Sequence, residues 1–455
     1  MKKNVFYLIS IMIFCSMICG CSSNGFMHSF GQLIGLNIAS DNVDTDVTIE
    51  YTVPEVEVLP PIESDTGSVE ENTSESEPIS ENDDVPTEEM SPEEEYIFDM
   101  ENKVFSKTAA SSDEITISFA GDVLLSQGCS VLNTAIKNDN DFSKSFDEGL
   151  LSLMTGSDIF MLNNEFPYST GGSPLPGKDY TFRADPQYAS MLNDIGTDIV
   201  SLANNHAFDY GPDALNDTFT TLRDINMPYV GAGENINEAI KPAYMKINGR
   251  TICIIGATQI EGSMSVPHTR PATDTQNGVF RCVDTTQIKE VVADAKTKSD
   301  FVIVFIHWGT EKTDVVREWQ KSTAADLEGS GADLIIGAHS HCLQGIDYIN
   351  DTPVFYSLGN YLFNSNSQDT CLITVTLDTQ NPGTTPIKSL QFIPCRQGGG
   401  KTVLADEDNK SRIIRYEQGI SYHALLDSDG YITYTENNMN TQNGQNTSPM
   451  RPKEE

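Results

Sequence analysis

The sequence predicts a single α/β domain whose sheet is covered by helices on both faces. Short, nearly continuous apolar runs alternate with segments of helical periodicity between residues 113 and about 430. Such runs are typical of strands buried on both faces, and strands that alternate with helices favour parallel pairing. Several runs also end in polar residues, which is where ligands bind in sheets of this kind. The span is long enough for one domain with a substantial core.

Seven apolar runs have the length and the β-branched content of strands. They are residues 115–120, 159–162, 199–203, 252–255, 301–306, 334–336 and 354–356. Three segments have helical spacing: 186–195, 212–225 with Pro212 at an N1-like position, and 313–327 with glycines just beyond its end. Residues 370–395 are expected to add further strands, and residues 397–401 to form a flexible loop.

The chain begins with a segment typical of a secretory signal peptide, predicted at residues 1–20. Lys2 and Lys3 precede an apolar stretch from residue 5 to residue 19, which is too short to span a bilayer comfortably. Residues 18–21 resemble the bacterial lipobox, which implies cleavage before Cys21 and a lipid on its sulfur. An uncleaved anchor and ordinary cleavage nearby are the alternatives. In each case we expect the folded part outside the cytoplasmic membrane, and the lipid would anchor it to the extracytoplasmic face of the bacterial cell membrane.

Residues 21–112 are predicted to form a disordered acidic stalk. Between residues 41 and 101 there are 22 acidic residues and no Lys or Arg. Such a segment cannot bury enough apolar surface to offset its ordering entropy, and its like charges extend it. We therefore expect the folded domain at residues 113–430, followed by a disordered tail at residues 431–455 that is rich in Asn, Gln, Thr and Pro.

The charge balance argues against one class of function. The formal net charge is −38, from 28 basic and 66 acidic residues. Nonspecific binding to nucleic acid needs a basic surface, so we expect no nucleic-acid partner. A polyanionic substrate would have to meet a local cluster of cations or a metal.

The cysteines do not indicate a metal knuckle. Six of the nine cysteines follow Cys21 in the chain, and none forms a Cys-x-x-Cys pair. Cys253 and Cys371 lie in strand-like runs, so we expect them to be buried thiols. Extracellular disulfides remain an alternative for which the sequence assigns no pairing.

Five of the predicted strands end in side chains that can bind a metal or catalyse a reaction. They are Asp122, Glu165, Asn205 with His206, His307, and the pair His339 and His341. Because the carboxyl ends of such strands meet at one edge of a sheet, we expect these residues to converge. Carboxylate, amide and imidazole ligands together suit a borderline divalent cation such as Zn²⁺, Mn²⁺ or Fe²⁺. The alternative is a structural polar rim.

The motifs around these residues resemble those of the CapA (PgsA) family. The resemblance lies in Gly121-Asp122, in residues 164–167 around Glu165, and in residues 201–206, 209–211, 307–311, 337–341 and 356–360. These motifs stand in the family's order and cover about residues 113–365. The family is associated with poly-γ-glutamate capsule biosynthesis and has a calcineurin-like metallophosphatase fold. The resemblance therefore implies a layered αββα sandwich.

The resemblance also implies roles for individual residues. The metal ligands would be Asp122, Glu165, Asn205, His307, His339 and His341. His206 would protonate the leaving group, and Asp209, three residues on, would orient it or only cap the turn that follows. We assign substrate binding to Arg183, Glu311 and Asn360. Leu124 stands where metallophosphatases have a histidine ligand, so one metal ion is expected rather than a complete pair.

Two classes of function follow. The first is a cell-surface lipoprotein with a metal-dependent hydrolase site that acts in the synthesis, export or anchoring of poly-γ-glutamate, or as a phosphoesterase on another envelope substrate. The second is a non-enzymatic export component that binds the polymer without cleaving it. In both cases the expected partners are the polymer, the membrane through the lipid, and membrane-bound synthase subunits.

Overall fold

The computed structural model describes residues 97–260, 269–363, 366–380 and 387–440, which belong to one compact unit. Cys21, the predicted signal peptide and most of the predicted stalk lie outside these residues. No helix among the described residues is long and apolar enough to cross a membrane.

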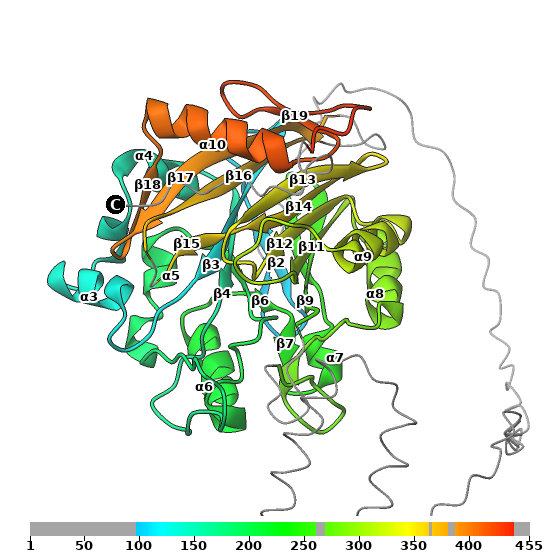
Figure 1. The fold of residues 1–455 in the computed structure, drawn as a ribbon. Coiled ribbons are helices and arrows are strands. Elements are labelled where there is room, and N and C mark those ends of the chain that lie inside the picture. The colour runs from blue at the N-terminus through cyan, green and yellow to red at the C-terminus, as the bar shows by residue number, and fades with distance from the viewer. Residues whose placement is uncertain (1–96, 261–268, 364–365, 381–386, 441–455) are drawn as a thin grey trace, which may run out of the picture. The chain divides into compact units, whose positions relative to one another are not determined.

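Two large mixed sheets form the centre of the domain (Figure 1). The first has the strand order β1 (Phe98–Asp99), β2 (Val104–Lys107), β8 (Ala243–Ile247), β9 (Arg250–Thr258), β11 (Phe301–His307), β12 (Leu334–Ala338), β14 (Thr352–Leu358) and β13 (Leu343–Ile349). The second has the order β18 (Lys401–Leu404), β17 (Ile387–Gly398), β16 (Gln368–Asp378), β3 (Glu114–Val123), β4 (Ile159–Asn164), β5 (Ile199–Ser201) and β6 (Tyr229–Val230), and β15 (Asn360–Leu362) also pairs with β3. The predicted α/β class is confirmed, and the two sheets are those of the αββα sandwich that the family resemblance implied, whereas the apolar runs alone indicated one sheet.

Each sheet has a parallel centre. The strands β9, β11, β12 and β14 pair in parallel in the first sheet, and β3, β4, β5 and β6 do so in the second. Antiparallel pairing flanks these centres: β8 pairs with β9 and β13 with β14 in the first sheet, and β16 follows β3 and pairs with β17 in the second. The parallel centres matter for function, because their carboxyl ends carry the candidate site residues.

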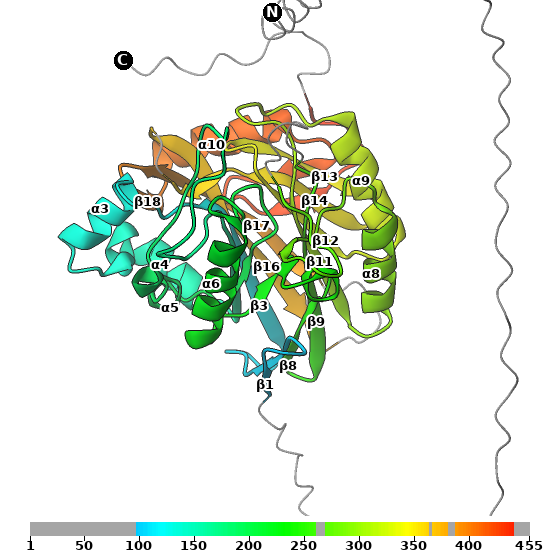
Figure 2. The ribbon, with the colours of Figure 1, turned by 90° about the horizontal axis from the view of Figure 1, so that it is seen from below.

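Three apolar clusters separate four layers. One cluster lies between the two sheets, and a second packs the first sheet against α8 (Thr286–Lys296) and α9 (Glu318–Gly329). The third packs the second sheet against α3 (Ser130–Lys137), α4 (Glu148–Thr155), α5 (Met191–Asp194) and α6 (Gly211–Asp224). Figure 2 shows these two groups of helices on opposite sides of the strands. A last long helix, α10 (Glu407–Ile420), packs mainly against β13 and β17.

Strand β11 shows why a strand covered on both faces has a continuous apolar sequence. Phe301, Ile303 and Phe305 point into the cluster between the sheets, whereas Val302 and Val304 point toward the helices on the other face. All of these side chains are fully buried. Side chains alternate between the faces of a strand, so a strand covered on both sides needs apolar residues at every position. Each burial of this kind contributes about 1.5–3 kcal/mol.

Several predicted boundaries were wrong. The helix predicted at 186–195 is a 3-10 turn (Pro186–Tyr188) followed by the single turn α5, because hydrogen bonds from Tyr188 and Ala189 to residues three positions earlier tighten its start. The helix predicted at 313–327 begins only at Glu318. The side chain of Gln344 donates a 3.0 Å hydrogen bond to the carbonyl of Thr313 and holds the residues before α9 as a loop.

The domain is also longer at both ends than predicted. Residues within the predicted stalk form β1 and β2, and β2 pairs in parallel with β8. Within the predicted tail, β20 (Ile432–Tyr434) pairs with β19 (Ala424–Leu426). The predicted loop at 397–401 is a tight hairpin in which Gly399 and Gly400 adopt positive φ between β17 and β18. Strand pairing, which composition does not show, accounts for all three differences.

The six cysteines of the described domain are free thiols. Cys253 and Cys371 are fully buried, as expected. Burial raises the pKa of Cys371 well above its ordinary value.

A candidate metal centre between the two sheets

The candidate site lies where the carboxyl ends of both parallel centres face each other. The second sheet contributes Asp122 from β3, Glu165 directly after β4, and Asn205 after β5. The first sheet contributes His307, the last residue of β11, and His339, the first residue after β12. None of these five residues is more than 5% exposed. The sequence predicted convergence at one sheet edge, whereas the structure brings the residues together from two sheets.

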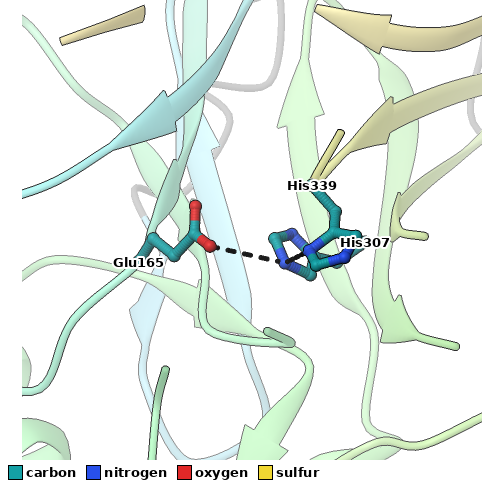
Figure 3. Close-up of side chains that lie close together, drawn as sticks. All are labelled: Glu165, His307 and His339. Carbon is teal, nitrogen blue, oxygen red and sulfur yellow. Dashed lines mark hydrogen bonds and ion pairs between the residues drawn. The ribbon is translucent and has the colours of Figure 1, made fainter. Parts of the chain in front are cut away.

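Two overlapping groups of side chains could hold metal ions, and both contain Glu165. The first group is Glu165, His307 and His339, and the second is Asp122, Glu165 and His341, with the ligand atoms in each group within 4.8 Å of one another. Figure 3 shows Glu165 facing the imidazoles of His307 and His339. Glu165 Oε1 lies 3.6 Å from His307 Nε2, which in turn lies 3.0 Å from His339 Nδ1. Because Glu165 belongs to both groups, its carboxylate could serve as a ligand shared between two ions.

An amide network holds these groups in place. Asn163 Nδ2 lies 2.8 Å from Asp122 Oδ1 and 3.3 Å from Glu165 Oε2, and it donates to both carboxylates. Asn204 donates a 2.9 Å hydrogen bond to Asn163 Oδ1, which fixes the orientation of that amide. Asn205 Oδ1 lies 2.8 Å from His307 Nε2. The doubled asparagines at the end of β4 and after β5 therefore supply one candidate ligand, Asn205, and two supporting amides, Asn163 and Asn204.

The turn that carries the two histidines after β12 has an unusual backbone. His339 and His341 both have positive φ, 98° and 56°, a region that non-glycine residues seldom occupy. The backbone N–H of His339 donates a 3.3 Å hydrogen bond to Asp122 Oδ2, which also lies 3.3 Å from His341 Nδ1. Gly337 makes this turn possible, because a Cβ there would lie 2.1 Å from the Tyr356 carbonyl oxygen. Asp122 thus holds the turn against the second sheet.

A second, charged network adjoins the metal groups. His206 Nδ1 lies 2.7 Å from Asp209 Oδ2, so Asp209 accepts the Nδ1 proton and leaves Nε2 free, 4.0 Å from Glu165 Oε1. Lys178 Nζ forms a buried ion pair with Asp209 Oδ1 at 2.5 Å and donates to the Asn205 carbonyl at 2.5 Å. The Phe182 N–H donates to Asp209 Oδ2 at 2.7 Å. Asp209 is therefore held by Lys178 and the Phe182 N–H, and it orients the His206 ring.

Burial sets the protonation of the site. Burial, with the adjacent Asp122 carboxylate, raises the pKa of Glu165 well above its ordinary value. Burial and the neighbouring histidines hold the pKa of His307 well below its usual range, and burial lowers the pKa of His206 despite Asp209. Burial also lowers the pKa of His341, but its hydrogen bond to Asp122 outweighs this, so the net shift is upward. Neutral His307 and His206 suit metal binding and proton transfer.

The residues assigned to substrate binding lie in different places. The Asn360 side chain is engaged at both ends, by His341 Nδ1 at 2.9 Å and by Gln368 Oε1 at 3.0 Å, so it supports His341 and is not free for a substrate. Glu311 is exposed and close enough to influence the pKa values of Glu165 and His341. Arg183 stacks on Tyr210 with its guanidinium carbon 4.2 Å from the ring centroid.

The sequence reasoning missed Lys178, Asn163 and Asn204. The two asparagines stand beside predicted ligands in doubled Asn motifs, which is a usable signal. Lys178 lies in a loop of residues 171–183, and no local pattern indicates that its side chain reaches Asp209. Its side chain is only 3% exposed, and lysines are rarely buried to this extent unless they are paired, as Lys178 is with Asp209.

The donor set fits a divalent cation. Glu165 Oε1 is buried and has no hydrogen-bond partner among the described residues, although its neighbours are polar. A buried carboxylate oxygen without a donor is costly, and a cation removes that cost. Two carboxylates, an amide and three imidazoles are ligands that Zn²⁺, Mn²⁺ and Fe²⁺ accept.

The fold and this cluster define an α/β protein with a buried carboxylate–imidazole centre of metal-binding composition. The chain belongs to the family described as Bacterial capsule synthesis protein PGA_cap, which residues 116–365 match, more than half of the chain. It is 28% identical to the PGA biosynthesis protein CapA of Bacillus subtilis (strain 168) over 337 residues, which covers 71% of this chain and 83% of that protein. It is 29% identical to the capsule biosynthesis protein CapA of Bacillus anthracis, over 52% of this chain and 57% of that protein.

The matches among solved structures are more distant. The protein TT1561 of Thermus thermophilus is 14% identical, with a TM-score of 0.33, and the match covers 57% of this chain and 93% of that one. A 5'-nucleotidase from Candida albicans SC5314 is 12% identical, with a TM-score of 0.32, and the match covers 63% of this chain and 52% of that one. Likenesses this low say nothing about what this chain does.

Proposed function

We propose that this protein acts in the synthesis of a poly-γ-glutamate capsule polymer as a metal-dependent hydrolase of the metallophosphatase type. The observation that carries the proposal is the pair of buried ligand groups that share Glu165, one of whose oxygens has no donor among the described residues. The capsule role is supported by the family match and by the names of the two Bacillus relatives. The substrate would be the polymer or a precursor of it.

Each ligand group has a clear role in this proposal. His307 and His339 with Glu165 would hold one divalent ion, Mn²⁺, Zn²⁺ or Fe²⁺, and Asp122 and His341 with Glu165 would hold a second. Leu124 occupies the position of a further histidine in metallophosphatases, so the group with Asp122 is the weaker of the two. A cation held there would polarise a substrate oxygen and lower the pKa of a water bound to it.

The chain's own residues would then handle the proton. His206 Nε2 faces Glu165, and its other nitrogen is held by Asp209. Because Asp209 accepts the Nδ1 proton, Nε2 of the neutral ring can accept a proton and then pass it to a leaving group while the ring stays fixed. Lys178 balances the charge of Asp209, which keeps that carboxylate in place as the orienting group. The Phe182 ring packs against the buried His206 ring, with the two centroids 4.5 Å apart.

The location of the protein is part of the proposal. The lipobox-like residues 18–21 support lipidation at Cys21, which would place the site at the extracytoplasmic face of the cell membrane, beside the membrane-bound synthase. The measurement is membrane fractionation of Cys21→Ser, for which we expect release into the medium. Membrane retention of this variant, with no lipid found by mass spectrometry, contradicts the placement.

Metal content tests the central claim. The purified full chain is loaded with Mn²⁺ or Zn²⁺ and its bound metal is measured, together with the His339→Ala and His423→Ala variants. We expect His339→Ala to lose most of its metal and His423→Ala to keep it, because His423 bonds to Asp347 and belongs to neither ligand group. A parent chain with less than about a tenth of an ion after loading contradicts the proposal.

Turnover separates the two function classes. The metal-loaded parent is incubated with a γ-glutamyl oligomer and with a generic phosphodiester, and products are followed by mass spectrometry. Cleavage of either that His206→Ala abolishes supports a hydrolase. Metal binding without cleavage of either supports the second candidate, a polymer-binding export component, which the same buried ligand groups would also serve.

A further inference from the structure

Two arginines flank the loop that carries Asp209, and neither has a carboxylate partner among the described residues. The Arg183 guanidinium lies 4.2 Å from the ring centroid of Tyr210, and that of Arg270 lies 5.6 Å from the ring centroid of Phe208. Phe208 and Tyr210 are the direct neighbours of Asp209. The described part of the chain contains no Asp or Glu oxygen within 4.0 Å of either guanidinium. Because the chain has 66 acidic and 28 basic residues, two arginines without a described carboxylate partner against the chain neighbours of Asp209 are unexpected.

The backbone ties Arg183 closely to the reaction centre. The preceding residue, Phe182, donates its N–H to Asp209 and packs its ring on His206. The same ring lies 6.3 Å from Phe363, whose ring lies 5.0 Å from that of His341. The two phenylalanines therefore form an apolar wall from His206 to His341. Arg183 follows this wall directly in the chain, next to the candidate catalytic histidine.

Both guanidinium groups have N–H donors beyond those used in their hydrogen bonds to Gly171 and Gln276, and these donors could bind an anion. Arg183 gives one N–H to the Gly171 carbonyl, and Arg270 Nη2 donates to Gln276 Oε1 at 2.6 Å. Stacking on an aromatic ring covers the face of a guanidinium and leaves the N–H groups at its edge available. These are neutral contacts, so each guanidinium keeps its full charge for a further partner. Planar guanidinium edges match carboxylates in a bidentate geometry.

We propose that Arg183 and Arg270 form a substrate subsite that binds carboxylates of successive residues along a γ-linked glutamate chain. The inference rests on the proposed function, because that function supplies the polymer. A γ-glutamyl chain carries one free carboxylate per residue, so contacts on both sides of the Asp209 loop would align the backbone amides across the metal groups. The subsite explains how a strongly acidic protein holds a polyanion: local, preorganised cations outweigh the long-range repulsion, which salt screens.

Direct binding to a labelled probe tests the subsite. A fluorescently labelled γ-glutamyl decamer is titrated with the full chain and with Arg183→Gln, Arg270→Gln and Arg415→Gln. Arg415 is the matched control, because it is an exposed arginine on α10 and its loss changes the net charge equally. We expect each of the first two variants to bind about 10-fold more weakly, the size of one charge-assisted hydrogen bond, and the control to bind like the parent. Arg183→Lys should recover only part of the affinity, since lysine lacks the planar fork.

Three results of these titrations would overturn the subsite. They are equal weakening by Arg415→Gln, unchanged binding by both Arg183→Gln and Arg270→Gln, and equal affinity for an uncharged γ-glutaminyl decamer. The His339→Ala variant separates this inference from the proposed function. Probe binding that persists in that variant supports the arginine subsite even if the parent chain proves to hold no metal. Loss of binding in that variant places the polymer on the metal instead and contradicts the subsite.

Discussion

The same strands of the second sheet carry polar clusters at both ends, and the two clusters are built differently. At the amino ends, Asp158 precedes β4 and accepts hydrogen bonds from the N–H groups of Ala110 and Thr116, both at 2.7 Å. Asp198 precedes β5 and accepts from the Phe160 N–H at 2.8 Å and from Lys107 Nζ at 2.5 Å. Every oxygen of these two carboxylates has a donor. At the carboxyl ends, Glu165 Oε1 has none among the described residues.

The difference separates a structural cluster from a functional one. A buried carboxylate that only holds the fold together is satisfied by backbone N–H groups, since an unmade hydrogen bond is costly. At the carboxyl ends of the strands, imidazoles and carboxylates lie close together with few hydrogen-bond donors among them. This arrangement favours binding of a cation from outside the chain. The amino-end cluster also ties Lys107 of β2 to the sheet, which is why the folded domain begins earlier than the acidic composition indicates.

The largest effect is expected from Glu165→Gln, which removes the residue that both ligand groups share. We expect the metal content to fall below about a tenth of that of the parent, with Glu290→Gln on α8 as an exposed control. The metal-free variant should melt no lower than the metal-free parent, because the charge removed is one whose pKa burial and Asp122 already raise. Elemental analysis and thermal melts check both points. A variant that keeps its metal contradicts the bridging role.

An intermediate effect is expected from Asp158→Ala at the opposite end of the strands. The change leaves two backbone N–H groups without an acceptor, which should lower the free energy of unfolding by about 2–4 kcal/mol. The metal content should be unchanged, because Asp158 belongs to neither ligand group. Urea unfolding measures the loss, and Asp274→Ala at an exposed turn is the control. If Asp158→Ala loses metal as completely as Glu165→Gln, the two clusters are not independent.

The smallest effect concerns Lys103, a buried cation outside both clusters. Its Nζ donates to the Glu238 carbonyl at 3.2 Å, and burial lowers its pKa to about 7. The unfolded chain holds the proton up to about pH 10.4, so between pH 7 and that value the unfolded state binds more protons. The contribution of this group to stability should therefore rise with pH, by at most about 1.4 kcal/mol per unit.

Denaturant unfolding from pH 7 to pH 9 for the parent and for Lys103→Met tests this sign. The parent should gain stability relative to the variant as the pH rises. If the free energy of unfolding of the parent stays constant relative to that of the variant, or falls, with rising pH, Lys103 keeps its charge in the folded state.

Much of the fold was predictable because its signals are local. The runs at 115–120, 159–162, 199–203, 252–255, 301–306, 334–336 and 354–356 all form strands, since strands covered on both faces need apolar residues at every position. Strands β1 and β2 were not predicted, because they lie in an acidic context and depend on pairing with β8. The 3-10 turn at Pro186–Tyr188 was missed because its hydrogen bonds differ from those of an α-helix by only one residue.

The sequence by itself determined which chemistry each strand end carries. Asp122, Glu165, Asn205, His307 and His339 each follow or end an apolar run, and chain-local patterns show this directly. Only the tertiary structure decided how those ends combine. Face-to-face packing of two sheets places Glu165 of one between His307 of the other and Asp122 of its own, and it brings Lys178 from a distant loop to Asp209. The physical reason is that a shared ligand and a buried ion pair each require side chains from separate segments to lie within a few ångströms of one another. Packing sets those distances, and residue order does not.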